Sequence, residues 1–488
     1  MPSATDLIFV AMLCAIVFTP VSVKLLGDAG IGWHIRTGQQ IIATHAVPRV
    51  DVFSSTMSGR PWFAWEWLYD VVVGQLDSWF GLNGVVWLTA VAIAAVFAWL
   101  FRLLVSRGCN LFVALVFVLL AAAASAIHFL ARPHVLSWLF TLSWFEILHS
   151  AERGRKRPLW ILPPLMLLWV NVHGGFVTGF ALLSMFWVEA FYEWQRARSD
   201  RIEESLQKID ALKRLRKLTW IGFLCGVASL LNPYGWRLHA HVYSYLSNRF
   251  LMNHIDEFQS PNFHGAAQRC FLVLLLLTVA MLVVRGRSLT LSSGLTVLFA
   301  IYAGLYASRN IPIASILLVL IIAPLAPCFA IARDFFSRMG TIESDLRGHL
   351  WPLVAIVATL LAAGRSMDAH FDPARMPVNA VNHLEAHGVA GPVLSTDYWG
   401  GYVIYRTYPK AQVVVDDRHD LYGEEFFRSY LTMMHGERGW ELFLRDHPAS
   451  CLLLPRNGAL TSLIVQTPEW KEIYSDEVAI AFERRPRH

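Results

Sequence analysis

The sequence predicts a polytopic α-helical membrane protein with about eleven transmembrane helices and a C-terminal α/β domain outside the membrane. Of its 488 residues, 55% are hydrophobic and only 16% are charged, whereas a soluble globular domain carries about 25% charged residues. Apolar runs that approach the roughly 17 to 25 residues needed to cross a bilayer recur through the first 366 residues. Beyond them, short apolar runs alternate with helical patterns, as in a small α/β domain.

The predicted spans are runs of mostly apolar residues separated by polar loops. The first follows the segment MPSATD, which has no basic residue, and it shows no small-residue cleavage site, so we interpret it as a retained anchor. The run at 159–172 is short and contains two adjacent prolines, so we expect it to be bent or tilted. The spans cover residues 5–26, 84–106, 111–128, 134–149, 159–172, 175–192, 218–232, 268–284, 289–307, 311–331 and 349–365.

Basic residues fall in alternate loops, and this predicts the orientation because cytoplasmic loops are enriched in Lys and Arg. The amino terminus is then cytoplasmic, the first outer loop covers residues 27–83, and the chain after about residue 366 lies outside. We expect a transmembrane bundle over 1–366 and an outer domain over 367–488. The basic residues are Arg102, Arg107, Arg153, Arg155, Lys156, Arg157, those between Arg196 and Lys217, Arg285, Arg287, Arg333, Arg338 and Arg347.

Polar motifs with chemical potential gather on the outer side of the predicted membrane. A charged residue at the centre of a span costs roughly 2.5–3.5 kcal/mol, so ionisable residues at membrane depth mark functional sites. Because five outward loops supply them, we predict one outer cavity. The motifs are GDAGIGWHI (27–35) and WEWLYD (65–70) in the first outer loop, then ARPH (131–134), NVHGGF (171–176), NPYG (232–235) and SRN (308–310).

Each motif also has a purely structural interpretation. Asp28 could cap the helix that follows it, because Asp is a favoured N-cap residue. The tryptophans of the first outer loop are typical of an interfacial aromatic belt, Arg132 could reach the headgroups, and NPYG is a common turn sequence. Three histidines could ligate a metal, but they come from separate loops and lack a ligand spacing: His34, His134 and His173.

The outer domain is predicted from alternating strands and helices. Strands are expected at 391–396, 411–417 and 450–455, and helices at 424–434 and 439–446. The motifs DYWGGYVIYR (397–406) and DDRHDLYG (416–423) follow two of these strands, and α/β sheets bind ligands at strand ends. Simple solvation of the acidic side chains in loops is the alternative.

Taken together, these motifs resemble those of a set of bacterial multi-pass proteins of the glycosyltransferase C superfamily. The resemblance spans nearly the whole chain and includes TG (37–38), DVFS (51–54), PW (61–62) and the outer-domain motifs. It implies a glycosyltransferase of the bacterial inner membrane that moves a sugar from a polyprenyl-phosphate-linked donor to a glycan, lipid or protein acceptor on the outer face. An adjacent acidic pair typical of such enzymes is missing, because Ala29 and Gly30 follow Asp28.

The resemblance suggests roles for single residues. In an inverting transfer a carboxylate takes the acceptor proton, and the departing phosphate needs cations or hydrogen-bond donors. Asp28 is the expected base, with Glu66 or Asp51 as alternatives; a divalent metal such as Mg²⁺ or Mn²⁺ stays open, since the same carboxylates could coordinate one. No nucleic-acid partner is expected. The expected substrate-binding residues are Arg132, Arg237 and Arg309 for the phosphate, and His34, His134, Asn171, His173 and Asn310 for sugar hydroxyls or phosphate.

Two other classes of protein fit parts of the pattern. A sugar transporter or flippase would also line a bundle cavity with polar residues, but it usually shows internal repeats and broken helices near midspan, and no clear repeat is present. A glycan-binding or glycan-assembly protein would use the bundle as an anchor, but it would not need acidic and basic residues from five loops.

Overall fold

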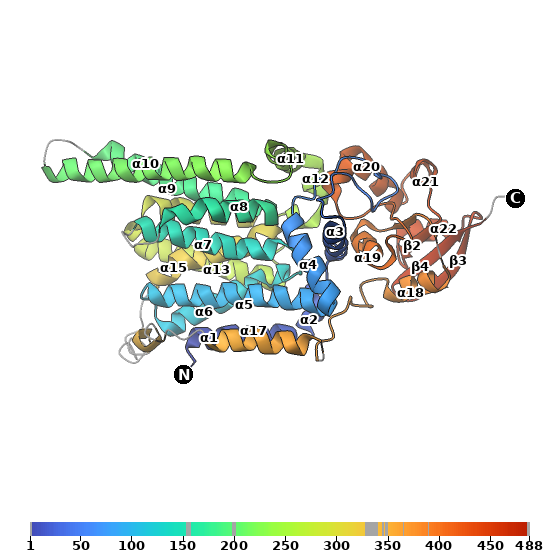
Figure 1. Cartoon of the computed structure of the whole chain (residues 1–488), viewed down its shortest axis with the longest axis horizontal. Coiled ribbons are helices and arrows are strands. Elements are labelled where there is room, and N and C mark those ends of the chain that lie inside the picture. The colour runs from blue at the N-terminus through green and yellow to red at the C-terminus, as the bar shows by residue number, and fades with distance from the viewer. Residues whose placement is uncertain are drawn as a thin grey trace.

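The computed structural model describes residues 2–152, 158–197, 202–326, 340–343, 346, 350–364, 366–388 and 390–485. Long helices run side by side along the length of the molecule as a bundle, and a small sheet lies beyond one end of it (Figure 1). The basic residues that the sequence places at 153–157, 333, 338 and 347 lie outside the described residues.

Helices coincide with all eleven predicted spans over most of their described residues. Among the described residues, five helical segments are long and apolar enough to cross a membrane: Leu82–Ser106, Leu111–His128, Gly174–Arg196, Ala266–Ser288 and Ser308–Leu325. Four shorter apolar helices cover Ala4–Val17, Leu159–Val172, Leu291–Tyr306 and Leu350–Ala363. The chain is therefore a multi-pass membrane protein, as predicted, and the number of its crossings stays a prediction.

The bundle helices have these bounds: α1 (Ala4–Val17), α2 (Val21–Leu25), α5 (Leu82–Ser106), α6 (Leu111–Ser125), α7 (His134–Glu152), α8 (Leu162–Val172), α9 (Val177–Arg196), α10 (Ile202–Leu230), α13 (Ala266–Arg285), α14 (Leu291–Tyr306), α15 (Ile311–Ile322) and α17 (Leu350–Ala363). The predicted span 5–26 is not one continuous helix, because α1 ends at Val17 and α2 begins after Pro20. Proline lacks the N–H of a helical hydrogen bond and clashes with the preceding turn. Residues 327–331 of another predicted span lie outside the described residues.

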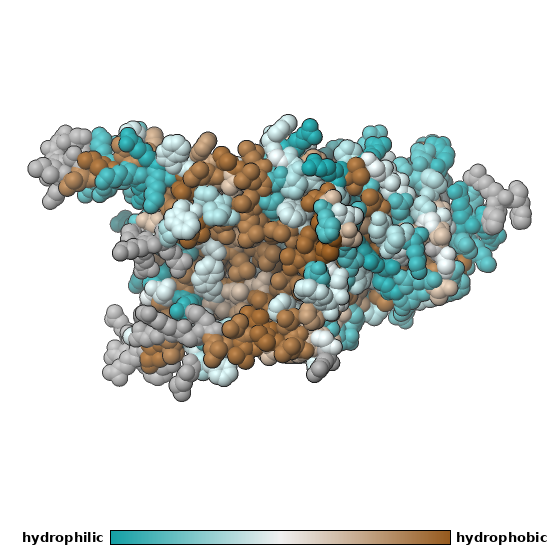
Figure 2. Space-filling model, in the orientation of Figure 1, coloured by the Kyte–Doolittle hydropathy of each residue, from teal (hydrophilic) through white to brown (hydrophobic). Residues whose placement is uncertain are grey.

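Apolar side chains cover much of the visible face of the bundle, whereas the outer domain is mostly polar (Figure 2). In α13, only 22% of the apolar window is buried, and the side chains of Leu276 and Val283 are 62% and 82% exposed. Apolar surface on this scale marks contact with lipid. By contrast, 67% of the corresponding window of α5 is buried, so this helix lies in the core of the bundle.

Two helices of the first outer loop, α3 (Ile31–Thr44) and α4 (Trp67–Phe80), pack against each other at the outer end of the bundle (Figure 1). Gly38 makes this contact possible, because a Cβ atom there would lie only 1.7 Å from the carbonyl oxygen of Asp70. A later outer loop adds α11 (Trp236–Ser247) and α12 (Arg249–His254). These elements carry the loop motifs toward the outer domain.

The outer domain contains a four-stranded sheet of order β1-β2-β4-β3. β1 (Val393–Ser395) is parallel to β2 (Cys451–Pro455), and β3 (Trp470–Ser475) and β4 (Ala479–Arg484) complete the sheet in antiparallel pairs. Its helices are α18 (Val378–Ala386), α19 (Asp397–Thr407), α20 (His419–Met434), α21 (Glu441–Asp446) and α22 (Ala459–Ile464). The predicted α/β class is therefore confirmed.

Two details of the outer domain differ from the prediction, and one agrees with it. The segment 411–417 is not a strand: Val413 forms single bridges with Val393 of β1 and with Ser54 of the first outer loop. The segment is extended, but β1 and the first outer loop each pair with it at only one residue, so no strand ladder forms. The motif at 397–406 follows the end of β1, as predicted, and forms α19. The β3–β4 hairpin was not predicted, because its exposed strand carries few apolar residues.

Candidate active site

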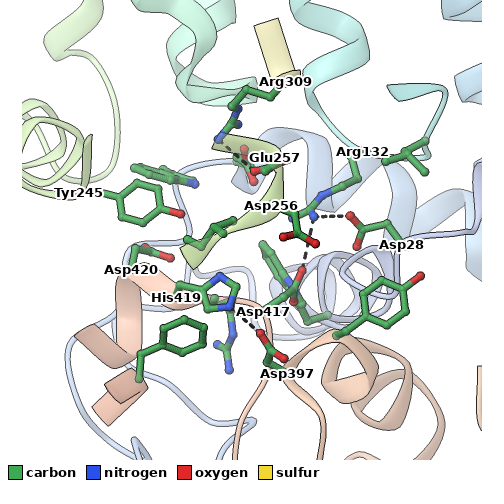
Figure 3. A pocket seen from close by; sticks show the side chains of 18 of the residues that line it. Asp28, Arg132, Tyr245, Asp256, Glu257, Arg309, Asp397, Asp417, His419 and Asp420 are labelled. Carbon is green, nitrogen blue, oxygen red and sulfur yellow. Dashed lines mark hydrogen bonds and ion pairs between the residues drawn. The ribbon is translucent and has the colours of Figure 1, made fainter. Parts of the chain in front are cut away.

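Two adjoining cavities lie where the bundle meets the outer domain. The outer cavity has a volume of about 550 Å³ and is walled by the first outer loop and the two outer-domain motifs (Figure 3). The inner cavity, of about 340 Å³, lies between α7, α9, α11 and α15. The cavities adjoin because they share six lining residues: Trp65, Glu66, His128, Tyr245, Glu257 and Arg309.

Arg132 holds two carboxylates from distant parts of the chain in the outer cavity (Figure 3). Its Nη1 atom lies 2.6 Å from Oδ2 of Asp28 and 3.4 Å from Oδ2 of Asp417. The other oxygen of Asp28 accepts the backbone N–H of Gly30 at 2.8 Å. Trp33 donates its indole N–H to Oδ1 of Asp417, also at 2.8 Å. One guanidinium therefore serves one carboxylate of the first outer loop and one of the outer domain.

Glu66 stands at the junction of the two cavities with only 8% of its surface exposed. Its carboxyl oxygens lie 3.6 Å from Nε2 of His34 and 3.6 Å from Nε2 of His173. Burial raises the pKa of Glu66 to about 8, although Arg132 opposes the shift. The carboxyl group is therefore mostly protonated at neutral pH and can donate a hydrogen bond into either cavity.

The two histidines beside Glu66 are held by fixed partners. The backbone N–H of Gly175 points at Nδ1 of His173 at 3.0 Å, so Nδ1 is an acceptor and Nε2 carries the proton that faces Glu66. His34 is fully buried, and its Nδ1 lies 2.6 Å from Oδ1 of Asp70. The Asp70 contact fixes the orientation of the His34 ring, because an imidazole held through one nitrogen presents the other in a defined direction.

Arg309 and Glu257 form an ion pair at the junction of the two cavities (Figure 3). Nη1 of Arg309 lies 3.1 Å from Oε1 of Glu257, and its guanidinium carbon lies 4.4 Å from the ring centroid of Phe258. Burial alone would raise the pKa of Glu257, but Arg309 and Arg132 outweigh burial and lower it to about 2. Glu257 is therefore ionised at neutral pH, and Arg309 stays beside the inner cavity.

The outer domain adds a hydrogen-bonded dyad at the starts of α19 and α20. Nε2 of His419 lies 2.8 Å from Oδ2 of Asp397, whose other oxygen accepts the hydroxyl of Tyr430 at 3.0 Å. Burial alone would lower the pKa of His419, but the bond to Asp397 raises it. Nearby, Asp420 pairs with His241 of α11 at 2.9 Å. The motif at 416–423 thus faces the cavity and is not simply solvated.

Most residues that the sequence nominated line one of these cavities. Asp28 is not the N-cap of α3, because the helix begins at Ile31 after Gly30 and has no side-chain cap. His34 is fully buried beside Glu66 and lines neither cavity. Nominated residues in the outer cavity are Asp28, Glu66, Arg132 and Arg309, and those in the inner cavity are Glu66, His134, His173, Arg309 and Asn310.

Besides His34, three nominated residues lie outside both cavities. Asp51 is 1% exposed and sits 2.7 Å from Arg418, with further bonds from the Ser54 backbone and hydroxyl. Asn171 accepts the indole N–H of Trp67 at 2.8 Å and donates to two carbonyl groups. Arg237 is exposed at the start of α11. Asp51 and Asn171 are thus held by contacts within the protein, away from both cavities.

Several lining residues were not nominated: His128, Tyr245, Glu257, Asp397, Asp417 and His419. Asp397, Asp417 and His419 lie in motifs that the sequence singled out, but nothing local showed that they face the bundle. Glu257 lies in a loop without a recognisable motif, so no signal in the sequence could have found it.

Two of the three carboxylates that could hold a divalent metal are already paired with arginine. Asp28 is bound to Arg132 and Asp51 to Arg418. Across the residues that the structure describes, no three His, Cys, Asp or Glu side chains converge in an arrangement that could hold an ion.

No protein-family model matches the sequence, and no curated protein sequence matches it. Among solved structures, the crystal structure of the Archaeoglobus fulgidus oligosaccharyltransferase, tethered with an acceptor peptide containing the NVT sequon, is similar with a TM-score of 0.58 and 12% identity. The similarity covers 93% of this chain and 68% of that one. The chain therefore shares the fold of this oligosaccharyltransferase, which agrees with the predicted resemblance.

Two further structures align over nearly the whole chain. ArnT from Cupriavidus metallidurans bound to undecaprenyl phosphate gives a TM-score of 0.49 at 14% identity and covers 98% of both chains. The arabinofuranosyltransferase AftD from Mycobacteria gives 0.48 at 13% identity, covering 99% of this chain and 40% of that one.

Proposed function

We propose that the protein is an inverting membrane glycosyltransferase that moves a sugar from a polyprenyl-phosphate-linked donor to an acceptor on the outer face of the bacterial inner membrane. The observation that carries this proposal is the meeting of the two cavities at Glu66 and Arg309. A transferase needs separate places for a lipid donor and a polar acceptor, and it needs them to touch at the reacting carbon. The fold shared with an oligosaccharyltransferase agrees with this proposal.

The inner cavity suits the lipid donor. Val177, Val242 and Ile313 line it, and its wall includes Leu246 of α11 and Tyr306 of α14, which are 48% and 55% exposed. A polyprenyl chain could therefore leave the cavity toward lipid while its phosphate stays at the junction. There the guanidinium of Arg309, Nε2–H of His173 and the protonated Glu66 would bind phosphate oxygens and stabilise the charge that grows on departure.

The outer cavity suits a polar acceptor. Trp33, Trp62 and Trp65 offer ring faces, and carboxylates around them can accept hydroxyl hydrogens. In the transfer step the acceptor oxygen attacks the anomeric carbon and its proton passes to a carboxylate. The bond between that carbon and the phosphate oxygen breaks, and its electron pair leaves on the phosphate.

Of the three carboxylates nominated from the sequence, we expect two to be less suited to remove the acceptor proton. Asp51 lines neither cavity. Glu66 is mostly protonated at neutral pH, so it suits proton donation to the phosphate better than proton removal. Asp28 is paired with Arg132 and lines the outer cavity, where the acceptor would bind.

The test is sugar transfer by the purified protein in lipid vesicles that contain labelled polyprenyl-phosphate sugars, with an envelope extract as the acceptor source. Arg309→Gln should raise the donor KM, and Asp446→Asn, on the exposed surface of the outer domain, is a control expected to match the wild type. Binding of labelled donor without transfer under any condition would contradict the proposal and favour a flippase or a glycan-binding protein.

The orientation follows from the same proposal. If the cavities use acceptors on the outer face, the amino terminus is cytoplasmic and the outer domain is periplasmic or extracellular. A reporter enzyme that is active only outside the cytoplasm should be active when fused after residue 485 and inactive when fused at the amino terminus. The reverse pattern would place the site in the cytoplasm.

A further inference from the structure

We propose that Asp417 of the outer domain, and not Asp28 of the first outer loop, takes the proton of the acceptor hydroxyl. This assignment rests on the proposed glycosyl transfer and adds a catalytic residue contributed by the outer domain. Both carboxylates contact Arg132 and both line the outer cavity. The hydrogen bonds of each carboxylate distinguish the two residues.

Both oxygens of Asp28 are already occupied. Oδ2 lies 2.6 Å from Nη1 of Arg132, a short charge-assisted bond, and Oδ1 accepts the N–H of Gly30 at 2.8 Å. Its contact with Arg132 is 0.8 Å shorter than the contact between Arg132 and Asp417 (2.6 Å against 3.4 Å). Asp28 is therefore placed to hold Arg132 in position.

Asp417 is held less completely. Oδ1 accepts the indole N–H of Trp33 at 2.8 Å. Oδ2 is buried against Gly30, lies 3.4 Å from Arg132 and has no hydrogen-bond partner among the described residues. The side chain is 14% exposed and lines the cavity. Since each carboxylate oxygen has about two lone-pair positions, the Trp33 bond leaves one position on Oδ1 for the acceptor hydroxyl.

The backbone of the first outer loop is shaped around this carboxylate. A Cβ atom at Gly30 would lie 2.3 Å from Oδ2 of Asp417 and 3.1 Å from Oδ1 of Asp28. Any side chain at position 30 would therefore displace the outer-domain carboxylate. Gly30 allows Asp417 to approach the loop and to stand beside Asp28 without an adjacent acidic residue in the loop itself.

The electrostatic surroundings suit a base that works near neutral pH. Burial raises the pKa of Asp417 to about 7, Arg132 opposes the shift, and the negative charges of Asp28 and Asp416 add to it. At this value the group is ionised in a large fraction of molecules and still binds a proton firmly enough to drive the transfer. The charged and titratable groups that face it are Arg132, Asp28, Asp416 and His419.

Atoms and charges balance in the proposed transfer of the acceptor proton to Asp417. The acceptor O–H bond breaks and its proton goes to the Asp417 carboxylate, while the acceptor oxygen forms a bond to the anomeric carbon. The donor bond from that carbon to the phosphate oxygen breaks and its electron pair leaves with the phosphate. Asp417 then returns its proton to water, so no oxidant, reductant or further reactant is required.

The experiment compares Asp417→Asn, Asp28→Asn and the surface control Asp446→Asn in the vesicle transfer assay across pH. Asp417→Asn keeps an oxygen for the Trp33 bond but loses the base, so kcat should fall by about 10²- to 10⁴-fold while labelled donor still binds. Asp28→Asn should keep measurable transfer, and the acid limb of its pH profile should shift to lower pH because a like charge beside Asp417 is gone.

Trp33→Phe provides a second variant in case Asp417→Asn folds poorly. It keeps the carboxylate but removes its indole donor, so the acid limb should move to higher pH with a several-fold lower kcat. Wild-type transfer rates in Asp417→Asn, or complete loss in Asp28→Asn with an unshifted profile in Trp33→Phe, would overturn the assignment to Asp417 alone. Absence of transfer by the wild-type protein would overturn it together with the proposed function.

Discussion

Gly32 of the first outer loop lies directly against Gly401 of the outer domain. A Cβ atom on Gly32 would stand 2.1 Å from the carbonyl oxygen of Gly401, and a Cβ atom on Gly401 would stand 2.3 Å from the carbonyl oxygen of Ala29. Backbone therefore touches backbone between α3 and α19, and this contact sets the distance between Asp28 and Asp417.

Gly32→Ala should separate α3 from α19, because the added methyl group meets backbone that cannot rotate away. We expect a loss of about 1–3 kcal/mol in stability and a clear loss of transfer activity. Thermal unfolding in detergent micelles measures the first effect and the vesicle assay the second. Gly294→Ala in α14 is the matched control, since nothing lies within 4 Å of its added Cβ; equal behaviour of the two variants would contradict the tight contact.

Glu66→Gln should remove the alkaline limb of the pH profile of kcat. Because Glu66 has a raised pKa of about 8, its protonated donor form dominates below that pH and is lost as pH rises through it. Gln donates at every pH, so activity should stay level where the wild type declines. Initial rates between pH 6 and about 9.5 test this; an inactive Glu66→Gln variant at pH 6 would instead identify Glu66 as the base.

Substitutions of Arg309 and Arg237 should have different effects on the donor KM, although the sequence nominated both residues for the phosphate. Arg309 lines both cavities, whereas Arg237 lies outside them. Arg309→Gln should raise the donor KM at least about tenfold, equivalent to about 1.4 kcal/mol of binding, and Arg237→Gln should leave it unchanged. Titration of labelled donor gives both values. Equal losses in the two variants would show that the phosphate does not sit at the cavity junction.

Asn171→Ala should affect stability and not substrate binding. The variant loses the bond from Trp67 and leaves two backbone carbonyls without their amide donor, so we expect a loss of about 1–3 kcal/mol. The donor KM should be unchanged at a temperature where the variant is folded. A raised donor KM with an unaltered melting temperature would return Asn171 to the list of substrate-binding residues.

The helices of the bundle could be predicted from the sequence because the length of an apolar run depends only on residues that are neighbours in the chain. Each predicted span coincides with helix, and even the break in the first span has a local cause at Pro20. The outer domain was predictable in class but not in detail. The segment around Val413 looks like a strand by composition, but its pairing depends on how closely Val393 and Ser54 approach.

The candidate site was predictable only in part. Asp28, Glu66, Arg132 and Arg309 were found because each stands in a polar motif beside a predicted span. Asp51 stands in an equally suggestive motif, and nothing local distinguishes it. Its burial beside Arg418 depends on a residue 367 positions away in the sequence.

The sequence by itself determined the membrane bundle, the side on which polar motifs gather and the α/β character of the outer domain, because these follow from composition and periodicity within short windows. Only the tertiary structure decided which charges share a site. Arg132, Asp28 and Asp417 meet because α19 packs against α3 through glycine. Charge interactions act over a few ångströms in space, and no sequence pattern encodes which distant residues the packing brings within that range.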